Sequence, residues 1–186
     1  MTPAFTSPDA PTIDDAVGPL LETLREGPDP AVRAFAALTL AQSGRSVAVP
    51  ALIAALADPE KVVRTAAGRA LVSLGTEAVP ALIAALDDPS WVVRYRAAEA
   101  LGGIRDSRVA PALVALLEDR KDHVRYMAAK GLGADPAPAA VDALLRRLDD
   151  ENPFVRRMAA QALRSAAASL GGADAARIDS ALRLQD

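Results

Sequence analysis

The side chains best suited to bind another molecule lie close to an arginine that recurs along the chain. This arginine occupies positions 33, 64, 94, 125 and 156, at spacings of 31, 30, 31 and 31 residues. Every aromatic residue after Phe5, the single histidine and both internal methionines lie within three residues of one copy. Aromatic, methionine and arginine side chains are enriched where proteins bind each other. The pattern therefore predicts an interaction surface that is repeated with variations.

The predicted surface consists of positions at which the copies differ: three and two residues before the arginine, and one, two and five after it. Trp91 and Tyr95 are four residues apart and share one helix face, and Tyr126 repeats the Tyr95 position one copy later. We predict a partner-binding groove formed by Phe35, Leu38, Lys61, Thr65, Arg69, Trp91, Tyr95, Arg96, Glu99, His123, Tyr126, Met127, Lys130, Phe154, Arg157 and Met158. The alternative is that some of these side chains pack between the copies, and for Phe35 and Phe154 neither outcome is favoured.

Residues that could catalyse a reaction or hold a metal are scarce. His123 is the only histidine and the chain has no cysteine, which leaves neither a histidine-based metal cluster nor a thiol nucleophile. Asp119 and Asp122 near His123 could orient it as a base, although capping of a helix start explains them more simply. No serine lies in a nucleophile-elbow context, and no glycine loop suits a phosphate. The sequence predicts no catalytic residue, no cofactor and no bound metal.

The composition narrows the classes of partner. Of the 186 residues 51% are hydrophobic but only 3% aromatic, which indicates an alanine-rich core of closely packed helices. The net charge of −3 argues against nucleic acid, and the arginine pairs at 146–147 and 156–157 are offset by acidic residues at 149–151. No apolar run approaches the roughly 18 residues of a membrane span, and residues 1–11 lack the features of a secretory signal. We expect a cytoplasmic protein that binds neither nucleic acid nor a membrane.

Helices are predicted throughout the chain after residue 12. Apolar residues at helical spacing, prolines at helix starts and glycines at helix ends indicate five helix pairs and one closing helix. We place the pairs at about 13–26 with 30–43, 46–57 with 60–74, 77–87 with 90–103, 108–118 with 122–133, and 138–149 with 153–169. The closing helix is placed at 174–185. The second helix of each pair carries the recurring arginine after a valine, and is called a Val-Arg helix.

One apolar stripe of the Val-Arg helices predicts the core. It comprises the valine before each arginine, small residues three and four positions after it, and a leucine seven after it. The valines are Val32, Val63, Val93, Val124 and Val155. The arginine itself is predicted to be structural, binding aspartates or helix-end carbonyls between units. The turns before these helices are expected to differ in shape, because their Asp-Pro pairs lie at different distances from the arginine and the fourth copy has none.

Val-Arg, paired alanines and leucine at this spacing, alternating with a Pro-Ala-Leu helix, resemble HEAT repeats, in particular the short bacterial PBS-lyase HEAT-like type. The resemblance covers residues 13–171. It implies an all-α, right-handed α-solenoid of five two-helix HEAT-like repeats, with the Val-Arg helices on the concave side. The repeats are expected at about 13–44, 45–75, 76–105, 106–135 and 136–171, between a flexible tail at 1–12 and a C-terminal capping helix at 172–186.

These observations predict a non-enzymatic scaffold that binds a protein or peptide on the concave surface of its Val-Arg helices, as a monomer or weak homo-oligomer. Two alternatives stay open. The resemblance implies a bilin lyase or another chromophore-handling protein, and the same repeat type is the basis of engineered binders. HEAT-repeat hydroxylases hold iron with His-Glu pairs, which this chain lacks. HEAT-like DNA glycosylases bind nucleic acid, a function that the charge balance opposes.

Overall fold

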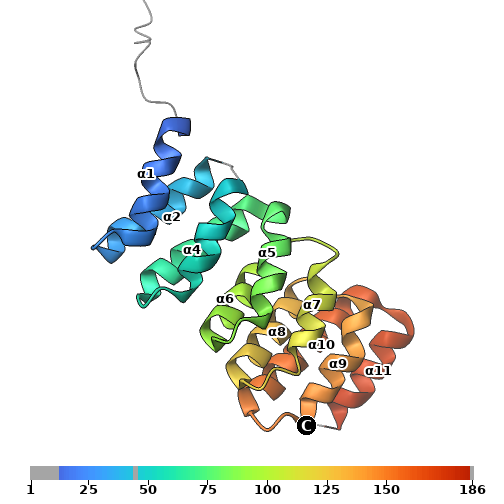
Figure 1. The fold of residues 1–186 in the computed structure, drawn as a ribbon. Helices are drawn as coiled ribbons and strands as arrows, with labels where there is room; N and C mark the ends of the chain where they lie inside the picture. The colour runs from blue at the N-terminus through green and yellow to red at the C-terminus, as the bar shows by residue number, and fades with distance from the viewer. Residues whose placement is uncertain (1–12, 44–45, 185–186) are drawn as a thin grey trace, which may run out of the picture.

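The chain folds into two layers of helices that follow one another from one end of the molecule to the other (Figure 1). The computed structural model describes residues 13–43 and 46–184, and these contain helices and no strand. The first layer contains α1 (Ile13–Glu26), α3 (Val49–Ala54), α5 (Val79–Ala84), α7 (Val109–Leu116) and α9 (Val141–Arg146). The second contains the Val-Arg helices α2 (Pro30–Gln42), α4 (Lys61–Leu74), α6 (Trp91–Leu101), α8 (Asp122–Ala134) and α10 (Pro153–Leu170). The closing helix α11 (Gly172–Arg183) packs on α9 and α10.

Single 3₁₀ turns extend the short helices of the first layer. They are η1 (Ser46–Ala48), η2 (Ala55–Ala57), η3 (Gly75–Glu77), η4 (Ala85–Asp87), η5 (Pro138–Ala140) and η6 (Arg147–Asp149). Pro50 and Pro80 occupy the first turns of α3 and α5, where a missing N–H breaks no helical hydrogen bond. Two Val-Arg helices have side-chain caps: Asp29 accepts from the Ala31 N–H, and Asn152 accepts from the Phe154 N–H. The predicted solenoid of five helix pairs and a closing helix is confirmed.

The core lies between the layers and between successive Val-Arg helices. The leucine seven residues after each arginine is fully or almost fully buried in every copy, as predicted. Leu40, Leu71, Leu101, Leu132 and Leu163 are at most 2% exposed. Alanines beside them let neighbouring helices approach closely. The predicted tail at 1–12, the boundary at 44–45 and residues 185–186 of the predicted cap lie outside the described residues.

Val32 departs from the predicted core stripe. The equivalent valines are buried, but Val32 is 47% exposed. The reason is its position in the layer: α2 is the first Val-Arg helix, and in the described part of the chain no earlier one covers that side. The prediction that all five valines belong to the core was therefore wrong at the first copy.

The turns before the last four Val-Arg helices share one hydrogen-bond pattern, so the prediction that they differ in shape was wrong for these copies, whereas the first copy has Gly27 in place of the aspartate. An aspartate lies six residues before the arginine in the last four copies: Asp58, Asp88, Asp119 and Asp150. Each carboxylate accepts the backbone N–H two residues later, at 2.8, 2.8, 2.7 and 2.9 Å respectively. The proline that sometimes follows is not required for this turn. Because the aspartate alone makes the hydrogen bond, it defines the shared turn better than the Asp-Pro pair does.

Candidate functional site

Three of the five recurring arginines join successive units through ion pairs. Arg125 donates Nε and Nη2 to the two carboxylate oxygens of Asp150, both at 2.8 Å, although Asp150 belongs to the next unit. Arg94 makes the same bidentate pair with Asp119 at 2.7 and 2.9 Å, and Arg33 makes it with Asp58 at 3.0 Å twice. Such planar two-point pairs fix geometry as well as charge.

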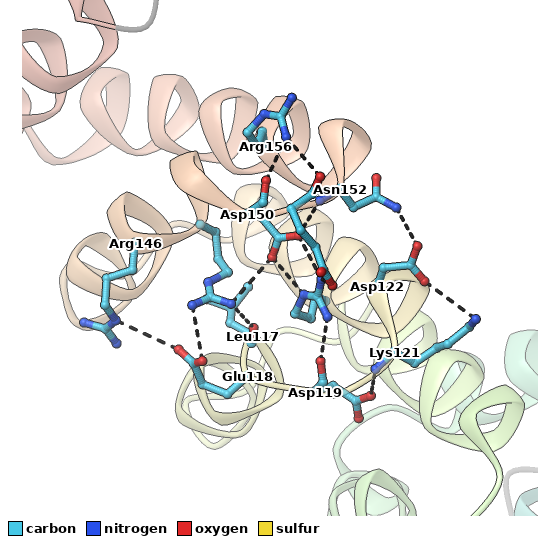
Figure 2. A network of polar contacts seen from close by, with 12 residues as sticks. Leu117, Glu118, Asp119, Lys121, Asp122, Arg146, Asp150, Asn152 and Arg156 are labelled. Atoms are coloured by element: carbon cyan, nitrogen blue, oxygen red, sulfur yellow. Dashed lines mark hydrogen bonds and ion pairs between the residues drawn. The ribbon is translucent and has the colours of Figure 1, made fainter.

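Each turn is also bound from its own unit. Arg156 donates Nη1 to the backbone carbonyl of Asp150 at 2.8 Å, so Asp150 is held by its own unit and, through its carboxylate, by Arg125 of the preceding unit (Figure 2). Arg64, Arg94 and Arg125 donate to the equivalent aspartate carbonyls, and Arg33 to the carbonyl of Gly27. The prediction that these arginines are structural is confirmed.

The buried carboxylates stay ionised because of these bonds. Burial alone would raise the pKa of Asp150, but the Arg125 hydrogen bonds, the Asn152 N–H and the Arg125 charge together lower it. The pKa of Asp119 is lowered by the same balance, with Arg94 and the Lys121 N–H opposing burial. The ion pairs between units are therefore permanent at neutral pH.

The bidentate ion pair between an arginine and the aspartate of the next unit, called the clamp from here on, is missing between the second and third units. Arg64 donates Nη1 to the carbonyls of Asp58 and Pro59, but no carboxylate pairs with it in the described chain, and its buried Nε has no hydrogen-bond partner. The paired arginines and aspartates are 25 residues apart, whereas Arg64 and Asp88 are 24 apart. Gly75 turns the chain between α4 and α5 with a φ of 64°.

A cavity of about 550 Å³ opens on the solvent-exposed side of α6, α8 and α10. Six of the predicted groove residues line it: Tyr95, His123, Tyr126, Phe154, Arg157 and Met158. Asp122, Asn152, Val155 and Gln161 complete the lining and were not among the predicted residues. Asp122 and Gln161 stand at the same variable positions as the predicted set, so their spacing from the arginine was the available signal.

Asp122 organises the polar corner of this cavity. Its carboxylate contacts the backbone N–H of His123 at 2.8 Å and His123 Nδ1 at 2.7 Å, and accepts from the side-chain amide of Asn152 (Figure 2 shows the Asn152 contact). The hydrogen bond with His123 is the largest of the effects that lower the pKa of Asp122 to about 2. Asp119 pairs with Arg94 instead and takes no part in the cavity lining. The cavity lining contains no serine, threonine or cysteine beside the His-Asp pair.

The aromatic side chains of this face pair with cations and with one another. The Trp91 and His123 rings lie 5.4 Å apart, and Lys121 Nζ lies 5.4 Å from the Trp91 centroid. Arg157 lies 5.2 Å from the Phe154 centroid. Burial raises the pKa of Tyr95, which is partly covered. The exposed faces of these rings form an apolar surface framed by positive charge.

The remaining predicted residues are scattered over the same layer. Phe35 is 67% exposed and Phe154 59%, so neither packs between units. Thr65, Arg69 and Glu99 line a separate cavity of about 310 Å³ between α4 and α6. The others that reach solvent outside both cavities are Leu38, Lys61, Trp91, Arg96 and Lys130.

Met127 is wrongly included in the predicted groove, because it is only 2% exposed and belongs to the core. The position two residues after the arginine faces a neighbouring helix rather than solvent. Ala66 is buried there as well, and Arg96 and Met158 are half-buried. Phe35 escapes burial at this position because α2 begins the layer.

In residues 13–43 and 46–184 no group of three or more acidic or histidine side chains could hold a metal, and no helix is long and apolar enough to cross a membrane.

The paired helices and the turns clamped between units define an α-solenoid of repeated two-helix units. The family described as HEAT repeats matches residues 17–88 and 79–164, and the chain belongs to this family. No curated protein matches the chain in sequence.

Several solved structures are similar. A chain from the complex of CpcE and CpcF of phycocyanin lyase from Nostoc sp. PCC7120 is 30% identical, over 89% of this chain and 70% of that one, with a TM-score of 0.58. A structure described under TOG-tubulin binding specificity is 15% identical, over 94% and 84%, with a TM-score of 0.57. A designed armadillo repeat protein in complex with peptide (KR)4 is 20% identical, over 83% and 85%, with a TM-score of 0.51. The last two likenesses show the fold alone.

Proposed function

We propose that this chain is a non-enzymatic scaffold that binds a protein or peptide on the concave surface of its Val-Arg helices, the solvent-exposed side of that helix layer. The observation that carries the proposal is the cavity on α6, α8 and α10, with the side chains of Tyr95, Tyr126, Phe154 and Met158 in its lining. Apolar pockets with a few placed polar groups, here Asp122 and Asn152, are the usual form of binding sites. Large anchors seated in such pockets supply most of the affinity at protein interfaces.

The architecture supports this proposal by keeping the cavity rigid. Its three helices are held in register by the Arg94–Asp119 and Arg125–Asp150 pairs, whose side chains are at most 8% exposed. A surface that is already ordered loses little conformational entropy on binding. The designed armadillo relative was solved with a bound peptide, which illustrates the use of a helical repeat surface in that protein.

The test compares two phenylalanines of the same layer. Phe154 lies in the cavity lining and Phe35 lies outside it, and both are well exposed. We expect Phe154→Ala to abolish recovery of the partner in a pull-down followed by mass spectrometry, and Phe35→Ala to leave it unchanged. Equal recovery by both variants, with unchanged circular dichroism, is the result that would refute the cavity as the binding site.

The second candidate function is binding of a linear tetrapyrrole. The likeness to a chain of the phycocyanin lyase complex, at 30% identity, favours it. The chain spans 70% of that relative, so residues of the relative have no counterpart here. Titration with a linear tetrapyrrole would give an absorbance shift that Tyr126→Ala weakens if this function holds. An unchanged spectrum together with recovery of a protein partner would exclude it.

The quaternary state and the location stay predictions. We propose a monomer or a weak homo-oligomer, since the helix faces already described account for the core without a partner copy. Analytical ultracentrifugation over a range of concentrations measures this directly. The predicted cytoplasmic location goes beyond the finding that no described helix could cross a membrane.

A further inference from the structure

The solvent-exposed face of the Val-Arg layer carries positive charges that no carboxylate of the described chain neutralises. Lys61 and Arg69 on α4, Lys130 on α8 and Arg157 on α10 are exposed. Across the described residues none of these four has a carboxylate within ion-pair distance, in contrast to Arg96, which pairs with Glu99 at 2.7 Å. Unpaired cations on one face create a field that attracts an acidic partner.

Two acidic side chains of this face, Glu99 and Asp122, are already engaged. Glu99 is paired with Arg96, and Asp122 contacts His123, Asn152 and, at 3.8 Å, Lys121. The unpaired charge of the face is therefore positive, although the whole chain carries a net charge of −3. Since the rest of the surface must be more acidic than the average, the positive charge marks this face in particular.

One of these cations, Arg157, lines the apolar cavity. The Arg157 guanidinium lies over the Phe154 ring at 5.2 Å, and both side chains line the cavity with Tyr95 and Met158. Lys130 on α8 and Arg69 on α4 both occupy the position five residues after the recurring arginine of their helix. This places charge on both sides of the apolar surface of α6 and α8.

We propose that the occupant of this surface is an acidic peptide segment with one large apolar side chain, a deepening that rests on the proposed function. The apolar side chain enters the cavity among Tyr95, Tyr126 and Phe154. The carboxylates of the segment lie against Arg157, Lys130 and the α4 cations. Neighbouring helices of a layer lie about 10 Å apart, which an extended peptide spans with about three residues. Acidic residues about three positions apart in the peptide would therefore reach cations on adjacent helices. A separation of about six would match Lys130 on α8 and Arg69 on α4, which are two helices apart.

Nucleic acid fits the same face less well. The phosphates of a nucleic acid would be repelled by the carboxylates of Asp122 and Glu99 while they approach the cations. A nucleic-acid backbone carries one negative charge on every nucleotide, so the wide spacing of the cations does not match it. The acidic overall charge of the chain adds long-range repulsion of a polyanion. A peptide with few charges and an apolar anchor avoids both costs.

The experiment is a selection of twelve-residue peptides from a random displayed library on the full chain. We expect selected sequences to be enriched in Asp and Glu around one Phe, Leu or Trp. Their affinity should fall at least tenfold between about 50 and 300 mM salt, because screening weakens the ion pairs. The double variant Lys130→Glu/Arg157→Glu should lose at least tenfold in affinity. The matched control is Arg25→Glu, an exposed charge reversal on α1 of the other layer, which should change nothing.

The possible outcomes separate the two proposals. Selected peptides that depend on Phe154 but show no acidic bias would overturn the charge inference and leave the proposed function standing. Absence of any selected peptide that depends on Phe154 would overturn both. Salt-sensitive binding of a fluorescent single-stranded or duplex oligonucleotide, lost in Lys130→Glu/Arg157→Glu, would replace the peptide by nucleic acid as the occupant.

Discussion

The junction between α4 and α6 and the junction between α6 and α8 differ in how tightly two neighbouring units are joined. At α6–α8 the Arg94–Asp119 pair clamps the turn, and a Cβ atom at Gly102 would lie only 2.9 Å from Gly131 Cα. At α4–α6 Arg64 has no carboxylate, Gly68 has nothing within 4 Å of its would-be Cβ, and a cavity of about 310 Å³ opens beside it. The α6–α8 junction has an ion pair and closely packed glycines, whereas the α4–α6 junction lacks the ion pair and leaves open space beside Gly68, although a Cβ at Gly103 would still lie 3.2 Å from Val72.

The difference coincides with a one-residue change in spacing. Arg64 and Asp88 are 24 residues apart, whereas the three arginine–aspartate pairs that form are each 25 apart. In a solenoid each unit contacts only its neighbours, so a change of register in one turn alters one junction and leaves the others intact. The proposed binding cavity lies on α6, α8 and α10, the helices joined by the Arg94–Asp119 and Arg125–Asp150 pairs.

The largest effect is expected from breaking the best-buried clamp. Arg125→Met leaves Asp150, whose side chain is 2% exposed, buried without its main partner, and should lower the free energy of unfolding by about 3–5 kcal/mol. The matched variant Arg64→Met loses only hydrogen bonds to two carbonyls, and should cost about 1–2 kcal/mol. Urea denaturation followed by circular dichroism measures both. Similar losses in the two variants would show that the missing carboxylate does not distinguish the junctions.

Acid should weaken the clamped junctions selectively. The folded-state pKa values of Asp58, Asp119 and Asp150 lie below their ordinary range. The unfolded chain therefore binds more protons than the folded chain as the pH falls below about 4, and stability that is fully present above that pH is lost on acidification. Urea midpoints between pH 5 and pH 2.5 should fall more steeply for the parent and Arg64→Met than for Arg125→Met. Parallel curves for all three proteins would contradict the assignment of the acid sensitivity to Asp150.

Close packing at α6–α8 predicts a penalty for one added methyl group. Gly102→Ala would place Cβ against the backbone of Gly131, which cannot move aside as a flexible side chain can. We expect a loss of about 1–3 kcal/mol in the free energy of unfolding. A thermal midpoint equal to that of the parent would mean that α6 and α8 separate without cost.

The open junction predicts the opposite sign for the same kind of change. Gly68→Ala adds a methyl group in the interior of α4 where nothing lies within 4 Å, and replaces a poor helix former. It should raise the free energy of unfolding by up to about 1 kcal/mol. This is the smallest of the effects, and calorimetric midpoints of Gly68→Ala and Gly102→Ala measured side by side give the clearest reading. A loss of stability in Gly68→Ala would indicate that α4 and α6 are in closer contact than the geometry allows.

The periodic residues made the fold predictable. Helix positions, the buried leucines and the structural role of the arginines followed from the sequence, because each unit repeats one pattern and local rules govern where a helix begins and ends. The turns were misjudged because Asp-Pro is the more familiar signal, while the aspartate six residues before the arginine is the one that binds. The sequence shows that Arg64 and Asp88 are 24 residues apart, but only the structure shows that they form no ion pair.

The sequence by itself predicted an interaction surface on the Val-Arg helices, and the tertiary structure decided which of the predicted residues lie together. Aromatic residues at variable positions indicated a binding face on the Val-Arg helices. Only packing against neighbours could bury Met127, expose Val32 and gather six of the predicted residues with Asp122 and Asn152 around one cavity. The physical reason is that sequence periodicity fixes the direction of a side chain around its own helix. The exposure of that side chain depends on how close the neighbouring helix lies, and small residues such as glycine and alanine at the contact set that distance.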